Sequence, residues 1–514
     1  MASPDPELSS AKRIVLALTV ATVFFGRQIA SWSSPGNRYL YHWQRSDAFY
    51  LIAAVVIVSL ALVAMAEVLR RLGGRRATLA LRLAFLLVVG QLAVSFVLLP
   101  NAEQPLASAG VASLAVAGMG LIGFMRAEPL VTRVAVRTCL VFAPLPLILF
   151  VQMLSWRSWR ECGAGSVGPA PEPSARSVFI LVFDEWSMER SWAGNQFLPQ
   201  LARLRGLAER SFVYSNAHAP ASETYKSIPR MLYQESGLVL VNDGTADWRV
   251  GGRTVRAEMR PNLFRSAGSR DYRTALVGWY LPYAGLVGDD LDFCRAYPQV
   301  VKRRGAARLW DLLWANLQFL PDPASQALWR AQFAGAFSDN WFALEGLIEA
   351  EALQVARTSP PNTLAFFHFP VPHAPFIFNP DGSYRGAFPG HRMEGTVADQ
   401  HRHFQYLDTV LGRFLDTLRS SGKLDSALVV VTSDHSWKLD PNPEARALER
   451  VRWVPLLIKW PGQDSPVSVS GEFCLMSIGR IIDAAIGDRA PVERARTLLD
   501  SLANASEGDK CRDF

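Results

Sequence analysis

Residues 177–185 have the sequence SVFILVFDE, in which an apolar run rich in β-branched residues is followed by two carboxylic acids. A continuous apolar run of this length is typical of a strand that is buried on both faces of a parallel sheet. Similar runs predict further strands at 211–219, 274–281, 363–369, 427–433 and 453–460. Helical segments are predicted between them at 197–209, 224–233, 262–268 and 401–420. This alternation predicts an α/β domain whose mainly parallel sheet is covered by helices on both faces.

Acidic and imidazole side chains lie at the carboxyl ends of three of these strands. They are Asp184, Glu185, His368, His373, Asp434 and His435. Ligands of such sheets bind at the carboxyl ends of the strands. Carboxylate oxygens combined with imidazole nitrogens suit zinc or manganese. An acidic pair after a strand is commonly a solvated turn, so the predicted metal site rests on the shared placement of all six residues.

The segment ASETYKSIPRML (221–232) follows a predicted strand and begins a predicted helix. At a helix N-terminus, the backbone N–H groups and the helix dipole favour an anion. Ser222 or Thr224 could equally serve as the N-cap of that helix. Beside a metal, however, a threonine hydroxyl can lose its proton and attack phosphorus or sulfur. Thr224 is therefore a candidate nucleophile.

The order of these segments resembles the alkaline phosphatase/sulfatase superfamily over residues 177–465. The segments are ILVFDE, TYKSIPRML, HFPVPHAPF, VVVTSDH and VPLLIKWPG. With the apolar N-terminal third described below, the chain is similar to the membrane-anchored branch of this superfamily. That branch contains phosphoethanolamine transferases and phosphoglycerol transferases of the lipoteichoic-acid-synthase type. The resemblance implies an alkaline-phosphatase-like α/β fold.

The resemblance also implies roles for single residues. Thr224, with Ser227 and Pro229, resembles the nucleophilic threonine of the transferases' T-x-x-S-x-P motif. His373 resembles the histidine of the sulfatases' P-H-x-P-F segment, which lies near the substrate and can act as an acid or base. The implied metal ligands are Asp184, Glu185, Asp434 and His435, from the acidic pair after the first strand and the S-D-H-G motif.

The chain departs from the family pattern at several positions. No P-S-R follows Thr224, which argues against ordinary sulfatase chemistry, and Ser436 replaces the usual glycine of S-D-H-G. Residues 436–452 contain no histidine where the family has a histidine or lysine, so Lys438 is a candidate substrate-binding residue. Trp279 lies where sulfatases have G-K-W-H, and it is either a substrate contact or a core aromatic residue.

Two further residues have alternative interpretations. Lys226, two residues after Thr224, either steadies a phosphate or faces solvent. His368 either contacts the substrate or packs at the end of its strand. We treat both as candidate substrate-binding residues.

The first third of the chain has the composition of a membrane domain. Its five apolar runs are each long enough to span a bilayer, and they lie at 14–32, 49–69, 78–99, 106–125 and 134–155. The distribution of Lys and Arg between the runs predicts a cytoplasmic N-terminus by the positive-inside rule. The sequence therefore predicts a five-span transmembrane domain at 1–156, a linker at 157–176, and an outward-facing catalytic domain at 177–514.

The charge distribution excludes a nucleic-acid-binding role for the soluble part. The net charge is +7. Residues 1–155 contain 13 basic and 6 acidic residues, so 13 − 6 = +7, whereas residues 156–514 contain 40 of each. The soluble part thus lacks the basic surplus expected of a nucleic-acid-binding domain.

The five cysteines form no CxxC pair, so a cysteine zinc cluster is not expected. Cys139 lies in an apolar run. The other four could form two disulfides in an oxidising compartment, and the sequence leaves their pairing open: Cys162, Cys294, Cys474 and Cys511.

The resemblance and the topology together predict a function. The expected enzyme uses a divalent metal, with zinc favoured over manganese or calcium, and moves a phosphoethanolamine- or phosphoglycerol-like group through a phospho-threonine at Thr224. The donor would be a membrane lipid and the acceptor an envelope glycan or lipid, at the outer side of a bacterial inner membrane. The alternatives are a membrane-anchored phosphodiesterase or sulfatase, and an inactive relative that binds a lipid or glycan.

Overall fold

The structure is a computed structural model of the 514-residue chain. It describes residues 9–33, 38, 42–69, 71, 130, 133–163, 176–242, 245–250, 252–298, 302–317, 323–386, 395–486, 491–503 and 511. The chain divides into two compact units. The first contains Met1–Arg38, Trp43–Ser158 and Lys302–Gly335, and the second contains Tyr39–His42, Trp159–Val301 and Ala336–Phe514.

The first unit contains the apolar helices. Two of them, Arg45–Leu69 and Arg133–Ser155, are long and apolar enough to cross a membrane; the second includes α5 (Leu145–Ser155). The predicted run at 14–32 forms α1 (Ser10–Ser33). The predicted runs at 78–99 and 106–125 lie outside the described residues. The described residues thus contain two candidate spans, and five spans remain a prediction.

The first unit also includes residues 302–335, which the sequence analysis had assigned to the catalytic domain. Polar contacts explain part of this grouping. The buried carboxylate of Asp47 accepts hydrogen bonds from Lys302 Nζ at 2.5 Å and from an Arg308 guanidinium nitrogen at 3.0 Å. Asn316, in α11 (Ala306–Leu317), donates to Gln28 Oε1 at 2.6 Å. Contacts across more than 250 residues of sequence leave no local pattern from which to predict them.

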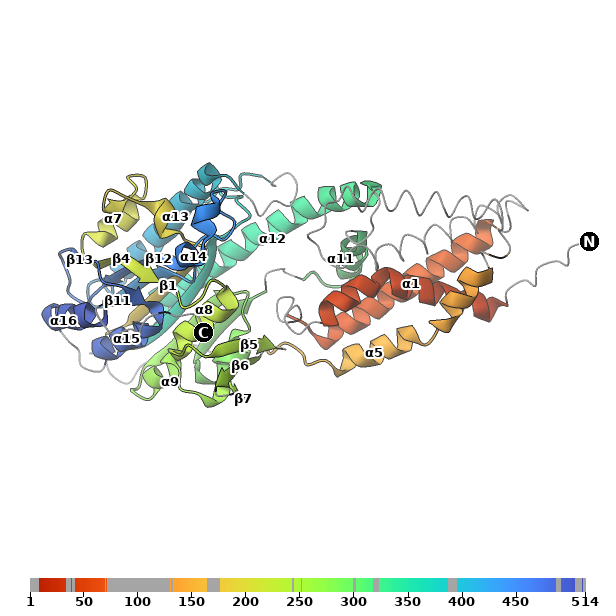
Figure 1. Cartoon of the computed structure of the whole chain (residues 1–514), viewed down its shortest axis with the longest axis horizontal. Coiled ribbons are helices and arrows are strands. Elements are labelled where there is room, and N and C mark those ends of the chain that lie inside the picture. The colour runs from red at the N-terminus through yellow and green to blue at the C-terminus, as the bar shows by residue number, and fades with distance from the viewer. Residues whose placement is uncertain are drawn as a thin grey trace, which may run out of the picture. The chain divides into compact units, whose positions relative to one another are not determined.

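The second unit is built on a nine-stranded sheet (Figure 1). The strand order is β13-β4-β12-β11-β1-β10-β8-β9, and β14 also pairs with β4. The strands are β1 (Val178–Asp184), β4 (Phe212–His218), β8 (Arg273–Trp279), β9 (Phe293–Tyr297), β10 (Thr363–Pro372), β11 (Leu428–Ser433), β12 (Trp453–Lys459), β13 (Val467–Val469) and β14 (Phe473–Cys474). Only the pairings of β12 with β11 and β4 are antiparallel. The prediction of a mainly parallel sheet is confirmed.

Alternation along the central strands gives the sheet two apolar faces. In β1, Val178, Ile180 and Val182 belong to the core on one face, and the residues between them belong to the core on the other. The first face is covered by α8 (Thr224–Tyr233), α9 (Leu263–Gly268), α15 (Ile478–Ile486) and α16 (Val492–Ala503). The second is covered by α7 (Ala202–Ala208), α12 (Pro323–Thr358) and α13 (Val397–Ser420), as Figure 1 shows. The predicted helical cover on both faces is therefore present.

Several elements of the second unit had no sequence prediction. They include the strands β9, β13 and β14 and the helices α12, α15 and α16. They also include a three-stranded sheet of β5 (Leu238–Asn242), β6 (Thr245–Val250) and β7 (Arg253–Arg256), the hairpin of β2 (Trp192–Ala193) and β3 (Gln196–Phe197), and the short helices α6 (Met188–Ser191), α10 (Tyr283–Leu286) and α14 (Leu448–Arg452). The structure pairs Cys162 with Cys294 and Cys474 with Cys511 in disulfides. Cys139 is a buried free thiol.

Candidate metal and nucleophile site

The strand order brings the predicted ligands together. Because β1 lies between β10 and β11, with Val182 level with His368 and Thr432, the three strands end side by side. Asp184 ends β1, and Asp434 and His435 directly follow β11. One ligand atom from each of Asp184, Asp434 and His435 lies within 4.8 Å of the other two. All three side chains are buried.

Thr224 lies at the first position of α8 and faces this group. Its Oγ1 lies 3.1 Å from His435 Nε2. The N-cap of α8 is Glu223, so the alternative that Ser222 or Thr224 caps the helix is wrong. A hydrogen bond from Ser227 Oγ to the Asp434 carbonyl, at 2.6 Å, holds the first turn of α8 against the end of β11. The T-x-x-S spacing therefore places the Thr224 hydroxyl beside His435 and the Ser227 hydroxyl against the end of β11.

The hydrogen bonds of His435 define which nitrogen faces the group. His435 Nδ1 lies 2.8 Å from the Ser436 carbonyl, which can only accept a hydrogen bond. Burial, followed by the charge of Lys438, lowers the pKa of His435 to about 3, so the ring is neutral. A neutral ring with its proton on Nδ1 presents a lone pair at Nε2, which is the form that binds a metal.

The residues of this group fit a divalent metal. Two ligands of one tetrahedral zinc, bound at about 2.0–2.1 Å, lie about 3.3 Å apart. His435 Nε2 lies 3.4 Å from Asp434 Oδ2 and 3.8 Å from Asp184 Oδ1. Both carboxylate oxygens are buried and lack a hydrogen-bond donor among the described residues. Burial, and then the neighbouring Asp434, raise the pKa of Asp184 well above its usual range, which a bound cation would reverse.

Glu185, the other predicted acidic ligand, lies outside this three-residue group. Its backbone φ is 60°, so the chain turns sharply at the end of β1. Its Oε2 lies 3.8 Å from His373 Nε2. Burial lowers the pKa of His373, but the carboxylates of Glu185 and Asp184 outweigh burial and raise it overall. The His373 ring contacts Trp279 and Trp341, with centroid distances of 5.9 and 5.6 Å.

The family model described as Sulfatase matches residues 176–482, which is more than half of the chain and contains every residue of this site. The chain belongs to the sulfatase family. It is therefore an enzyme of the alkaline phosphatase/sulfatase superfamily, whose members depend on metal. No curated protein sequence matches the chain.

Solved structures similar to this sulfatase-family chain share little sequence with it. Ps i-CgsB is 14% identical, with a TM-score of 0.42 and coverage of 66% of this chain and 77% of that one. The phosphonate monoester hydrolase of Agrobacterium radiobacter is 16% identical, with a TM-score of 0.39 and coverage of 61% and 74%. The lipoteichoic acid synthase LtaP of Listeria monocytogenes is 15% identical, with a TM-score of 0.37 and coverage of 63% and 76%.

The two candidate substrate-binding lysines of this sulfatase-family chain differ in where they lie relative to Thr224. Lys438 Nζ lies 3.1 Å from Oε2 of Glu223, the residue that precedes Thr224. Burial lowers the pKa of Lys438, but Glu185, Glu223 and Asp184 raise it overall, so it stays charged. Lys226 is two residues from Thr224 and thus about 200° around α8. Its Nζ lies 5.4 Å from the Tyr225 ring centroid.

The other two candidates are buried among aromatic rings. Trp279 is 1% exposed and packs against His368 and His373. This environment supports the interpretation of Trp279 as a core aromatic residue. His368 lies fully buried in β10, with Nδ1 2.8 Å from the Tyr283 hydroxyl and Nε2 3.6 Å from Asp184 Oδ2. His368 therefore adjoins Asp184, Asp434 and His435, which together are called the metal-ligand group because they could hold a metal ion.

Sequence reasoning missed three residues of the site. Tyr283, in α10, contacts His368, and Glu223 pairs with Lys438. Ser433 accepts a hydrogen bond from the Trp186 backbone N–H at 3.0 Å and donates to the His435 carbonyl at 2.6 Å. Tyr283 and Ser433 lie at or just after strand ends, which is the signal that could have found them.

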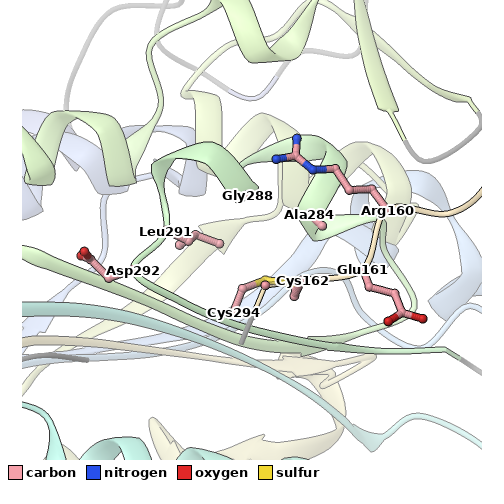
Figure 2. Close-up of a pocket in the computed structure, with 9 residues that line it drawn as sticks. Arg160, Glu161, Cys162, Ala284, Gly288, Leu291, Asp292 and Cys294 are labelled. Carbon is pink, nitrogen blue, oxygen red and sulfur yellow. A yellow bond between two sulfur atoms is a disulfide. The ribbon is translucent and has the colours of Figure 1, made fainter. Parts of the chain in front are cut away.

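A separate cavity of about 230 Å³ lies in the second unit beside the disulfide of Cys162 and Cys294 (Figure 2). Its lining includes Arg160, Glu161 and Asp292, and none of the predicted site residues lines it. We assign no role in the reaction to this cavity.

Proposed function

We propose that this chain transfers a phosphoethanolamine- or phosphoglycerol-like group from a membrane lipid to an acceptor at the outer face of the membrane. The observation that carries the proposal is the position of the Thr224 hydroxyl. It lies at the N-terminus of α8 and 3.1 Å from His435 Nε2, beside the buried Asp184 and Asp434. A hydroxyl among such groups can act as the nucleophile in a two-step transfer.

Asp184, Asp434 and His435 would hold the metal, with Thr224 as a fourth donor. Four donors, two of them carboxylates and one an imidazole, favour zinc, because calcium takes 6–8 oxygen ligands. When bound, such a cation lowers the pKa of the Thr224 hydroxyl and so favours its alkoxide near neutral pH. Glu185, whose Oε2 lies 3.8 Å from His373 Nε2, remains a further candidate ligand.

In the first step, Thr224 Oγ forms a bond to the phosphorus of the donor lipid. The bond between phosphorus and the diacylglycerol oxygen breaks, and protonated His373 supplies a proton to that leaving oxygen. The raised pKa of His373 supports this role as an acid. Lys438 stays charged and is the proposed counter-ion of the phosphate oxygens.

In the second step, the acceptor oxygen forms a bond to phosphorus and gives its proton to His373. The bond between Thr224 Oγ and phosphorus breaks, which restores the threonine alkoxide. Over both steps one proton passes from the acceptor to diacylglycerol through His373. The acceptor would be a glycan or lipid of the cell envelope.

Membrane anchoring is part of the proposal. The two candidate spans, Arg45–Leu69 and Arg133–Ser155, support it, and a lipid donor requires a site near a bilayer. The distribution of Lys and Arg supports five spans in a bacterial inner membrane, with the catalytic unit on the periplasmic or extracellular side.

Hydrolysis is the alternative that one observation favours. Asp184 stands at the first position of an acidic pair like that of the sulfatases, and it contributes to the metal-ligand group. With water as the acceptor, the same threonine intermediate would make the chain a phosphodiesterase. The convergence of a hydroxyl, two carboxylates and an imidazole disfavours an inactive relative.

The test is the mass of the peptide that contains Thr224, taken from full-length protein purified with its own membrane lipids. A phosphoethanolamine or phosphoglycerol adduct is expected, and it should be absent from Thr224→Ala. Retention of the adduct in Thr224→Ala would place it on another residue and contradict the mechanism. A sulfate adduct, distinguished by accurate mass, would replace phosphoryl transfer with sulfuryl transfer. Release of the free headgroup phosphate into water, without an acceptor product, would favour hydrolysis.

A further inference from the structure

A tyrosine and a histidine adjoin the metal-ligand group without belonging to it. The Tyr283 hydroxyl lies 2.8 Å from His368 Nδ1, and both side chains are completely buried. His368 Nε2 in turn lies 3.6 Å from Asp184 Oδ2. The three side chains form a row that leads from α10, through β10, to the carboxylate at the end of β1.

The two oxygens of Asp184 face different partners. Oδ1 faces His435 Nε2 at 3.8 Å, on the side of the metal-ligand group, and Oδ2 faces His368. His368 Nε2 has no hydrogen-bond partner among the described residues. The imidazole is therefore directed at the carboxylate oxygen that is not turned toward His435.

The Tyr283 hydroxyl is suited to donate to His368. Burial, and then the carboxylates of Asp434 and Asp184, raise the pKa of Tyr283 well above its usual range, so the hydroxyl keeps its proton. An imidazole that accepts this hydrogen bond at Nδ1 carries its proton on Nε2, which faces Asp184 Oδ2.

A glycine makes room for this arrangement. A Cβ built at Gly278, in β8, would lie 2.6 Å from Tyr283 Cε2, closer than a real Cβ contact allows. Any other residue at position 278 would therefore displace the tyrosine ring. The close approach of β8 to the ring is a feature independent of the hydrogen bond.

We propose that Tyr283 is a positioning residue, which holds His368 against Asp184 and thereby orients that carboxylate for the metal. The inference rests on the metal site of the proposed function. Groups that support metal ligands in this way typically change metal affinity by about 10–100-fold when they are removed. Tyr283 and His368 thus act on the metal site through Asp184.

The test measures the zinc affinity of the full-length chain by competition with a chromophoric chelator. Tyr283→Phe removes only the hydroxyl and should weaken zinc binding about 10–100-fold. Tyr214→Phe is the matched control, because Tyr214 is also completely buried and its hydroxyl donates to the Leu499 carbonyl at 3.5 Å. The control should bind zinc like the wild type. Equal zinc affinity in Tyr283→Phe and the wild type would overturn the inference.

A loss of fold is distinguished from a loss of positioning by melting in excess chelator. In excess chelator, Tyr283→Phe and Tyr214→Phe should have similar melting temperatures, because each loses one neutral hydrogen bond. Gly278→Ala, which displaces the ring and keeps the hydroxyl, should also weaken zinc binding; wild-type affinity in this variant would count against the inference.

The inference and the proposed function can fail separately. A wild-type chain that binds zinc but never forms a Thr224 adduct would contradict the transferase mechanism. The zinc affinities of Tyr283→Phe and the wild type would then still decide whether Tyr283 is a positioning residue. A wild-type chain that binds no zinc would overturn both.

Discussion

Acidic pairs are buried at two places in the described part of the second unit, and only one of these pairs belongs to a candidate metal site. At the ends of β1 and β11, Asp184 and Asp434 are joined by an imidazole and a threonine hydroxyl. On α12, Glu345 and Glu349 are also buried, but Glu349 is paired with Arg413 at 3.0 Å, and neither belongs to a possible metal-ligand group among the described residues. Burial raises the pKa of both Asp184 and Glu345. A buried carboxylate thus points to chemistry only where donors of different kinds converge.

The largest effect is expected from Thr224→Ala. Removal of a nucleophile that forms a covalent intermediate should lower turnover at least about 1,000-fold. Thr417→Ala is the matched control, because that threonine lies on α13 and its hydroxyl donates to the Arg413 carbonyl at 2.8 Å. Transfer of headgroup from a radiolabelled lipid is the measurement. Activity in Thr224→Ala within tenfold of the wild type would contradict the proposed mechanism.

Asp434→Asn should separate metal binding from stability. Zinc at 100 times its Kd should stabilise the wild-type fold by about 2.7 kcal/mol, and the variant should lose this gain. Without metal, the variant should be at least as stable as the wild type, because one of two adjacent buried carboxylates is gone. Thermal melts with zinc and with chelator provide the measurement. Equal zinc stabilisation in both chains would exclude Asp434 as a ligand.

Glu345→Gln should alter the pH dependence of stability and leave zinc binding unchanged. Burial, and then Glu349, raise the pKa of Glu345 well above its usual range in the folded chain. Its contribution to stability is therefore fully present below the unfolded-state pKa and is lost as pH rises through the folded pKa. Each unit of difference between the folded-state and unfolded-state pKa changes the free energy of unfolding by about 1.4 kcal/mol.

The amide should accordingly raise the urea midpoint at pH 8 more than at pH 5. An equal shift at both pH values would mean that Glu345 is ionised in the folded chain.

The smallest effect is expected from Lys226→Ala. The lysine lies on the far side of α8 from Thr224, over the Tyr225 ring, so its loss should cost about 0.5–1 kcal/mol of stability and leave the KM for lipid within about twofold. Lys438→Ala should raise the KM more, because Lys438 lies beside Glu223 and Glu185. Steady-state kinetics of the two variants distinguish the outcomes. A larger rise in KM for Lys226→Ala than for Lys438→Ala would reverse this assignment.

Local pattern was sufficient for six strands of the large sheet, β1, β4, β8, β10, β11 and β12, and for most of the site. The apolar runs at 177–183 and 427–433 correspond to β1 and β11, and the residues that follow them contribute the metal-ligand group. The helix expected at 224–233 is α8 with the same bounds. Such elements are predictable because β-branched runs, helical periodicity and strand-end polar residues are encoded within a few residues of one another.

Tertiary structure decided the details that depend on distant contacts. Among the described residues, Asp184 and not its neighbour Glu185 forms the group with Asp434 and His435. Residues 302–335 group with the N-terminal helices, where Asp47 pairs with Lys302 and Arg308.

The sequence by itself determined that this chain has an apolar N-terminal third and an α/β domain with acids, histidines and a hydroxyl at its strand ends. Only the tertiary structure decided which of these side chains meet. The order of β10, β1 and β11 sets Asp184 beside residues 250 positions away, the disulfide partners are fixed, and Tyr283 lies against His368. The physical reason is that local propensity specifies an element, whereas strand order and side-chain convergence follow from packing between elements that are distant in the sequence.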